Sequence, residues 1–362
     1  WEKKFLSPSL CNNVMTIDTF IGWDIGGAHL KLAVVDKSGM INKAMQFPSP
    51  LWLGMKYLEQ ALDSAAQHIP SEGKVIHVIT MTAELVDIFY DRRAGVLQLV
   101  SRFTQRFGNH VKVYAGRSGL LDPSSVETHA EEISSANWYA TANYAASQLA
   151  DGILLDVGST TTDIIPFQSG SCCQRGSTDQ ERLQYNELVY TGIIRTPVMA
   201  VVDRVPYKGE WQSLMAECFS TMADIYRLTG ELNENDDMMV PPDGAAKTPD
   251  ASRKRLARMF GTDAGEGENC SDWRQVALFI AEKQLQQITQ ALFHVLSNKT
   301  MTDHTPLIGA GCGRFLVKKL AHRTGHPYKD FAELLDVGNA FQLAAASCAP
   351  AVSIAQIARI GL

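Results

Sequence analysis

Two segments far apart in the chain share one unusual pattern: an apolar run that ends in Asp, a Gly-bearing turn, and a second apolar run. The first covers residues 20–35 and the second residues 152–166. Apolar runs joined by a short Gly-containing connection are typical of β-hairpins. The sequence therefore predicts two matched hairpins, each with a carboxylate, Asp24 or Asp156, at its mouth.

A third segment carries glycines in a different setting. An apolar run at 307–308 leads into Gly309, Gly311 and Gly313, and a helix is expected at 313–323. A strand that passes through a Gly-rich turn into a helix is a common way to build an anion site. Together with two hairpins that can face each other, it predicts a phosphate cleft between two duplicated lobes.

The remainder of the chain predicts an α/β fold, because strand-like and helix-like stretches alternate and helices can then cover a sheet. Buried strands are expected at 74–81 and 111–114. Helices are expected at 55–69, 83–90, 95–107, 130–150, 211–228, 271–296 and 339–360.

With 362 residues, the chain has room for two domains of ordinary size. We expect lobe I at 15–150, completed by a C-terminal helix within 339–362, and lobe II at 151–338. Lobe II contains the Gly turn at 309–313 and an excursion at 233–249, rich in Asp, Asn, Pro and Gly, which is expected to be exposed. Met15 looks like a natural start, so residues 1–14 are interpreted as an extension.

Composition excludes several classes of function. The net charge is −6 without a basic block, which argues against a nucleic-acid partner. No apolar run reaches the roughly 18 residues of a membrane helix, and 1–14 lacks the apolar core of a signal peptide. The seven cysteines show no C-x-x-C spacing, which indicates reduced thiols and a cytoplasmic location. We expect small-molecule substrates and leave a homo-oligomer open.

The two predicted turns can bind an anion. Successive backbone N–H groups in Gly-containing turns form anion-binding concavities, and hydroxyls and a lysine add donors and charge. The candidate phosphate-binding residues are Gly26, Gly27, Lys31, Gly158, Ser159, Thr160 and Thr161.

Asp24 and Asp156 would repel a bare phosphate. Mg²⁺ is commonly bound by one or two carboxylates together with substrate phosphates. We therefore expect Mg²⁺ between these two carboxylates, bound directly or through water.

The hairpins and the third Gly turn resemble the two phosphate motifs and the adenosine motif of the actin, sugar kinase and heat-shock chaperone superfamily. This resemblance implies two ribonuclease H-like lobes, the actin-like ATPase fold, with a cleft between them. Further segments are similar to its hydantoinase/oxoprolinase-like branch, which is linked to tetrahydromethanopterin-dependent one-carbon transfer. These segments are 79–85, 136–138, 156–166, 178–183, 187–192 and 195–197.

Characterised archaeal members of that branch are methanofuran-biosynthesis synthases. The resemblance implies a transferase that joins an aminomethylfuran-methyl diphosphate to the phenol of a γ-glutamyl acceptor and releases pyrophosphate. The phosphate apparatus would then hold the leaving group of the organic substrate, so Mg²⁺ is expected and ATP is not required. The acceptor could be of the tyramine or the tyrosine type.

Roles for charged residues follow from this reading. Asp163 and Glu84 are candidates to deprotonate the phenol or to bind the furfuryl amine, and Asp179 is a further catalytic candidate. Arg182 and Arg195 could fix the substrate, since guanidinium groups bind carboxylates in a two-pronged fork. The alternative for each is a structural ion pair or helix cap.

Two other classes of function stay open. An ATP-dependent kinase or hydantoinase/oxoprolinase-type enzyme would use Gly309, Gly311 and Gly313 to hold adenosine. A non-catalytic nucleotide-binding protein on the same fold is the second alternative.

Overall fold

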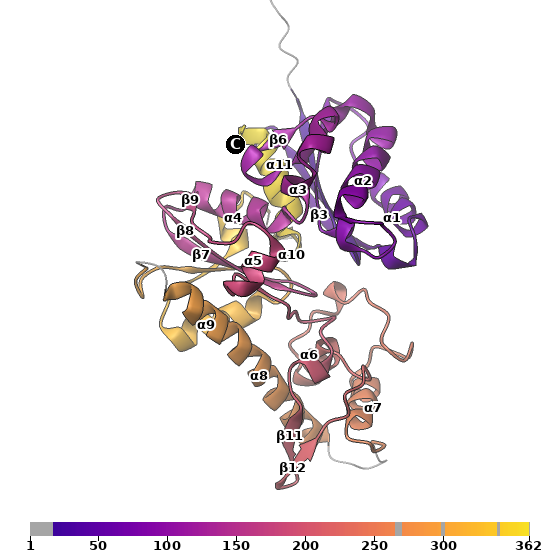
Figure 1. The fold of residues 1–362 in the computed structure, drawn as a ribbon, viewed down its shortest axis with the longest axis vertical. Coiled ribbons are helices and arrows are strands. Elements are labelled where there is room, and N and C mark those ends of the chain that lie inside the picture. Colours follow the sequence, from indigo (N-terminus) through magenta and orange to yellow (C-terminus); the bar gives the residue numbers. More distant parts are fainter. Residues whose placement is uncertain (1–16, 265–269, 298–300, 339–340, 362) are drawn as a thin grey trace, which may run out of the picture.

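The computed structural model describes residues 17–264, 270–297, 301–338 and 341–361. The expected extension at 1–14 lies outside these residues. The chain forms two lobes, each built on its own sheet, with helices around them (Figure 1). No helix within the described ranges has the length and apolar character to cross a membrane.

The sheet of lobe I has the strand order β3-β2-β1-β4-β5-β6. Strand β1 pairs antiparallel with β2, as the first predicted hairpin requires, and parallel with β4. Both faces of β1 are buried, which explains why its sequence is apolar almost throughout. The strands are β1 (Thr19–Ile25), β2 (His29–Asp36), β3 (Ile41–Pro48), β4 (Val75–Met81), β5 (Val111–Tyr114) and β6 (Leu120–Leu121).

The sheet of lobe II repeats the hairpin arrangement with the order β10-β8-β7-β13-β14. Strands β7 and β8 form the second predicted hairpin, and β13 pairs parallel with β7. A small separate hairpin, β11–β12, lies at the far end of this lobe (Figure 1). The strands are β7 (Gly152–Val157), β8 (Thr162–Gln168), β9 (Ser171–Cys172), β10 (Leu188–Val189), β11 (Arg204–Tyr207), β12 (Glu210–Ser213), β13 (Leu307–Ala310) and β14 (Tyr328–Asp330).

Helices cover both sheets and fill lobe II. Those of lobe I and the junction are α1 (Lys56–Ala66), α2 (Arg92–Phe107), α3 (Ala130–Ile133), α4 (Asn137–Gln148), α10 (Gln342–Ser347) and α11 (Ala349–Ile360). Those of lobe II are α5 (Asp179–Gln184), α6 (Met222–Thr229), α7 (Pro249–Met259), α8 (Cys270–Leu296) and α9 (Arg314–Thr324). Three short 3₁₀ turns matter below: η1 (Leu51–Leu53), η2 (Ala83–Leu85) and η7 (Glu234–Asp236).

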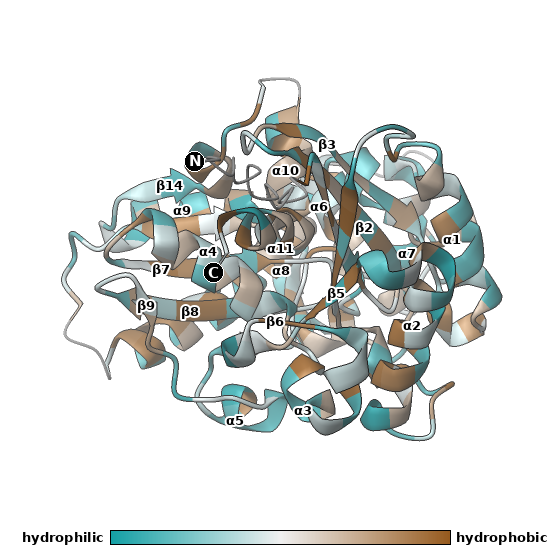
Figure 2. Ribbon diagram, turned by 90° about the horizontal axis from the view of Figure 1, so that it is seen from above, coloured by the Kyte–Doolittle hydropathy of each residue, from teal (hydrophilic) through white to brown (hydrophobic). Residues whose placement is uncertain are grey.

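Helices α4 and α11 join the two lobes. Helix α11 packs against β1, β2, β4 and α4, and Figure 2 shows it between the strands of the two sheets. Gly22 of β1 faces the backbone of Ala351, and a side chain there would collide with that carbonyl. One apolar cluster contains Val78 of lobe I, Leu154 of lobe II and Ile354 of α11, so the lobes share a core.

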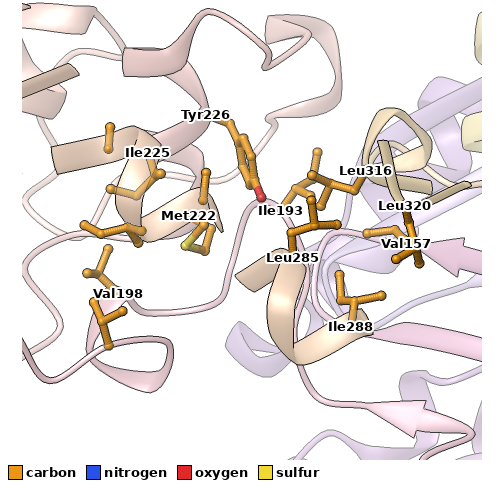
Figure 3. Packing of buried hydrophobic residues seen from close by; sticks show 14 of the residues in the cluster. Val157, Ile193, Val198, Met222, Ile225, Tyr226, Leu285, Ile288, Leu316 and Leu320 are labelled. Carbon is orange, nitrogen blue, oxygen red and sulfur yellow. The ribbon is translucent and has the colours of Figure 1, made fainter. Parts of the chain in front are cut away.

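A separate core fills lobe II beneath the second hairpin. Val157 packs with Ile193, Leu316 and Leu320, and the long helix α8 contributes Leu285 to the same cluster (Figure 3). This core packs against the end of β7 and so supports the turn that follows it.

Three helix predictions need correction. At 83–90 only η2 forms, because Asp91 caps the next helix by accepting from the Ala94 N–H and so fixes where α2 starts. The helix expected at 130–150 is broken at Ser135, whose φ is 53°. In 211–228 the first residues form β12, and α6 begins only after the capping box at Thr221.

The excursion at 233–249 is only partly exposed as expected. Asp236 and Asp237 are 8% and 7% exposed. Asp237 is ion-paired with Arg227 at 2.5 Å and with Lys247 at 3.5 Å, which compensates its burial. The Gln46 side chain of lobe I donates to Asp236 Oδ1 at 3.3 Å, so this segment connects the two lobes.

Candidate active site

The two hairpins bring Asp24, Lys31 and Asp156 into one charged cluster at the junction of the lobes. Asp24 and Lys31 are paired across the β1–β2 ladder, with Lys31 Nζ 3.4 Å from Asp24 Oδ2. Asn137 at the start of α4 donates to Asp24 Oδ1 at 3.4 Å. Asp156 interacts electrostatically with both Lys31 and Asp24. The expectation that the two aspartates share one site is consistent with this geometry.

The charge of Asp156 is poorly compensated. Burial, together with the neighbouring carboxylates Asp163 and Asp24, raises its pKa to about 7 against the opposing effect of Lys31 and Arg314. Asp163 stands directly opposite Asp156 in the β7–β8 ladder. Burial lowers the pKa of Lys31, but Asp24 and Asp156 more than offset this, so its pKa is raised and it stays charged.

The turn of the second hairpin offers donors without partners. The Gly158 N–H closes the turn by donating to Thr161 O at 2.8 Å. Among the described residues, no hydrogen bond engages the N–H groups of Ser159, Thr160 or Thr161, and the buried Ser159 hydroxyl also has no partner. Buried donors without partners are costly unless a ligand satisfies them.

The first turn is built the same way. The Gly26 N–H donates to His29 O at 2.9 Å, while the Gly27 carbonyl accepts from Leu51 N–H at 3.0 Å. Gly26 therefore shapes the turn. In the part of the chain described, the N–H of Gly27 has no hydrogen-bond acceptor.

The third Gly turn packs onto the second hairpin. Gly313 N–H donates to Val157 O at 2.8 Å, and Gly311 adopts a φ of 78°. A Cβ at Gly311 would collide with Val157 O and Asp156 Oδ1, and one at Gly309 would lie 2.9 Å from the Tyr328 ring. These glycines thus allow the turn to approach and bury Asp156.

A second polar group connects the lobes beside this cluster. Arg182 is 1% exposed, forms ion pairs with Asp163 and, at 3.5 Å, with Asp179, and stacks on the Trp138 ring at 3.9 Å. The Ser135 hydroxyl lies 3.2 Å from Asp179 Oδ2 and 2.9 Å from Glu84 Oε1, and its one proton can be donated to either carboxylate. The sequence candidates Glu84, Asp163, Asp179 and Arg182 therefore belong to one network, linked through Ser135.

The carboxylates of this network are not equivalent. Burial raises the pKa of Glu84, whose Oε1 accepts from Ser134 and Ser135 while Oε2 is buried without a partner. Burial also raises the pKa of Asp163, and Arg182 opposes the shift. Glu84 is the carboxylate with an acceptor atom to spare.

Sequence reasoning missed two charged residues of the site. Arg314 donates to Gly311 O at 2.9 Å, pairs with Asp330 at 3.1 Å and acts on Asp156. Its position directly after Gly313 was the available signal. Burial raises the pKa of Asp236, and Arg314 and Lys31 oppose that shift. Nothing in the composition of 233–249 distinguishes this aspartate.

The residues present fit a magnesium ion that would bind together with a phosphate-containing substrate. Within the described ranges, no group of three or more His, Cys, Asp and Glu residues could hold a metal on its own. Two carboxylates that share a site, one of them poorly compensated, match a hard cation that takes its other ligands from phosphate and water. Asp24 and Asp156 are the residues that would hold it.

The fold and these turns define a two-lobed α/β protein with the actin-like ATPase fold. A nucleotide-free structure of acetone carboxylase shows the same fold, with a TM-score of 0.57 and 11% identity over 94% of this chain and 70% of its own.

Residues 76–351 match the hydantoinase/oxoprolinase family, and the chain belongs to this family. A relative from Methanocaldococcus jannaschii is 32% identical over 244 residues, which are 67% of this chain and 72% of the relative. One from Methanococcus vannielii is 34% identical over 34% of this chain and 52% of its own. Both are named (4-{4-[2-(gamma-L-glutamylamino)ethyl]phenoxymethyl}furan-2-yl)methanamine synthase, so both relatives are named as enzymes.

Proposed function

We propose that this protein is a transferase of methanofuran biosynthesis. It joins an aminomethylfuran-methyl diphosphate to the phenol of a γ-glutamyl acceptor of the tyramine or tyrosine type and releases pyrophosphate. The observation that carries the proposal is the pairing of donors without partners at Ser159–Thr161 with the charged cluster of Lys31, Asp24 and Asp156. The names of the two synthase relatives support it.

The chemistry suits these groups. A furan ring stabilises positive charge at its exocyclic methylene as the C–O bond breaks, and negative charge grows on the departing pyrophosphate. Lys31 and the N–H and hydroxyl groups of the second turn would hold that charge, which lowers the barrier. Mg²⁺, held by Asp24 and Asp156, would supply further neutralisation of the leaving group.

The acceptor phenol, with a pKa near ~10, must lose its proton during or after attack. Glu84 is the better candidate, because its Oε2 is buried without a partner and can accept a proton, and burial raises the pKa of this carboxyl. Asp163, ion-paired with the buried Arg182, is the alternative and would position the site through that pair.

The test is to incubate the purified protein with both substrates and Mg²⁺ and to measure ether product and pyrophosphate together. Equal amounts of both are expected. A parallel incubation with γ-labelled ATP and a small acceptor covers the alternative of an ATP-dependent kinase or oxoprolinase-type enzyme. Acceptor-dependent phosphate release from ATP, without ether formation, would overturn the proposal.

A further inference from the structure

We propose that Trp52 and Arg195, one from each lobe, form the binding site for the acceptor: an aromatic ring that carries a carboxylate. This inference rests on the proposed function and deepens it. Trp52 was not among the candidates from sequence, and Arg195 was a candidate without a partner residue.

Each of the two residues is attached to one of the Gly turns. Leu51, the neighbour of Trp52, donates its N–H to Gly27 O at 3.0 Å, and Ser49 N–H donates to Ala28 O at 2.9 Å. On the other lobe, Arg195 N–H donates to Ser159 O at 2.9 Å. An anion bound between the two turns would therefore lie beside Trp52 and Arg195.

The two side chains meet across the lobes. The Arg195 guanidinium lies over the Trp52 ring, 5.2 Å from its centroid, and Arg195 Nη1 donates to Thr160 Oγ1 at 3.3 Å. The first distance is within the range of a cation–π interaction. The ring thus orients the guanidinium group at the end of a long, exposed side chain.

The pair also stays accessible. Trp52 is 37% exposed although Leu51 beside it is fully buried, and Arg195 is exposed. Within the described part of the chain the Arg195 side chain makes one hydrogen bond, to Thr160, so its other donors can take a carboxylate in the two-pronged manner. Trp52 offers an apolar face to the aryl ring of the same molecule.

The experiment compares two acceptor probes, γ-glutamyltyramine and tyramine, by calorimetric titration of the full chain. They share the phenol, but γ-glutamyltyramine carries the glutamyl α-carboxylate and α-amino group on a neutral amide, at the position where tyramine carries an ammonium group. We expect the wild type to bind γ-glutamyltyramine about 10-fold or more tightly than tyramine, the size of one charge-assisted contact. Arg195→Ala should abolish that preference, and equal binding of both probes to the wild type would overturn the inference.

Trp52→Ala should weaken both probes roughly 5-fold, and Trp52→Phe, which retains a ring, should restore most of this loss. In turnover, Trp52→Ala should raise KM for the acceptor and leave KM for the diphosphate substrate unchanged. A merely structural role would move both KM values, and Trp52→Phe keeps the question answerable if the alanine variant does not fold.

The chain offers a matched control. Trp211 on β12 is 59% exposed, and the Arg204 guanidinium lies 4.9 Å from its ring centroid, far from the Gly turns. Trp211→Ala should leave both affinities unchanged. Titration with inorganic pyrophosphate separates the two proposals. A wild type that does not bind pyrophosphate would contradict the transferase. Equal effects of Trp52→Ala and Trp211→Ala on the affinity for the acceptor probes would overturn the acceptor site alone.

Discussion

The two hairpins have the same topology but opposite charge pairing. In lobe I, Asp24 stands opposite Lys31 in the ladder, and the carboxylate is matched by a cation. In lobe II, the equivalent partner of Asp156 is Asp163, another carboxylate. Arg182 compensates Asp163, so Asp156 remains the carboxylate that burial and its neighbours hold near a neutral-range pKa of about 7.

The difference indicates a division of labour between the lobes. The first hairpin supplies an ion pair in which each charge has its partner, and a lysine that stays protonated. The second supplies a carboxylate without a matching cation and turn donors without partners, which the diphosphate and Mg²⁺ of the proposed function would complete. Buried polar groups that lack a hydrogen-bond partner or a counter-charge in a folded protein are more typical of a binding site than of a structural element.

The largest effect is expected from Asp156→Asn. Turnover should fall about 10²–10³-fold, the size typical of losing one preorganised charge-stabilising group. The free energy of unfolding should stay level or rise, because a neutral amide avoids the cost of burying a charge. Ether formation and urea unfolding measure the two quantities.

The equivalent change in lobe I, Asp24→Asn, is the natural comparison. It leaves Lys31 without its ion-pair partner, so we expect a loss of roughly 2 kcal/mol in unfolding free energy as well as reduced turnover. If both variants lost the same stability, the contrast between the hairpins would be wrong. Full activity in Asp156→Asn would reject the metal assignment.

The second prediction concerns how Asp156 is buried. Gly311→Ala should destabilise the protein by about 3 kcal/mol, because it adds collisions with Val157 O and Asp156 Oδ1 to the strain of a positive φ. Gly325 has a φ of 81° and open space around it. Gly325→Ala should therefore cost only about 1 kcal/mol, and thermal or urea unfolding of both variants measures the difference.

The sequence predicted some parts of the fold correctly and missed others. Both hairpins and the strand–turn–helix at Gly309–Gly313 were predicted correctly, because their signals are local: apolar runs and glycines at short spacing. The breaks at Ser135 and Thr221 were missed, since a positive φ and a capping box interrupt stretches whose apolar spacing still looks helical.

For the site, sequence supplied Asp24, Lys31 and Asp156 but not their pairing. The partner of Asp156 depends on the register of β7 and β8, and the groups that act on the buried Asp236, Arg314 and Gln46, come from other parts of the chain. Trp52 carries no motif at all. Its relation to Arg195 exists only because two lobes meet.

A third, smaller effect is expected from Lys31→Ala. The loss of a point charge beside the leaving group should lower kcat/KM for the diphosphate substrate about 10- to 100-fold and leave KM for the acceptor unchanged. Steady-state kinetics with each substrate varied in turn measures this. Lys37, 71% exposed at the far end of β2, provides the control Lys37→Ala, and equal kinetics of the two variants would return Lys31 to a structural role.

The last prediction concerns the dependence of stability on pH. An unfolded aspartate titrates near ~4, whereas Asp156 in the folded protein titrates at about 7. Between these values the folded chain holds a proton that the unfolded chain has lost. The contribution of Asp156 to the free energy of unfolding therefore falls as pH rises, by up to about 1.4 kcal/mol per pH unit, and is constant above the folded pKa.

Urea unfolding of the wild type and of Asp156→Asn across this range isolates that term, because the asparagine cannot titrate. The difference between the two curves should change between about pH 4 and about pH 7 and then level off. Activity should run the opposite way, rising as Asp156 ionises, because only the carboxylate can help to hold a cation. Parallel stability curves for the two proteins would show that the second hairpin is as well compensated as the first.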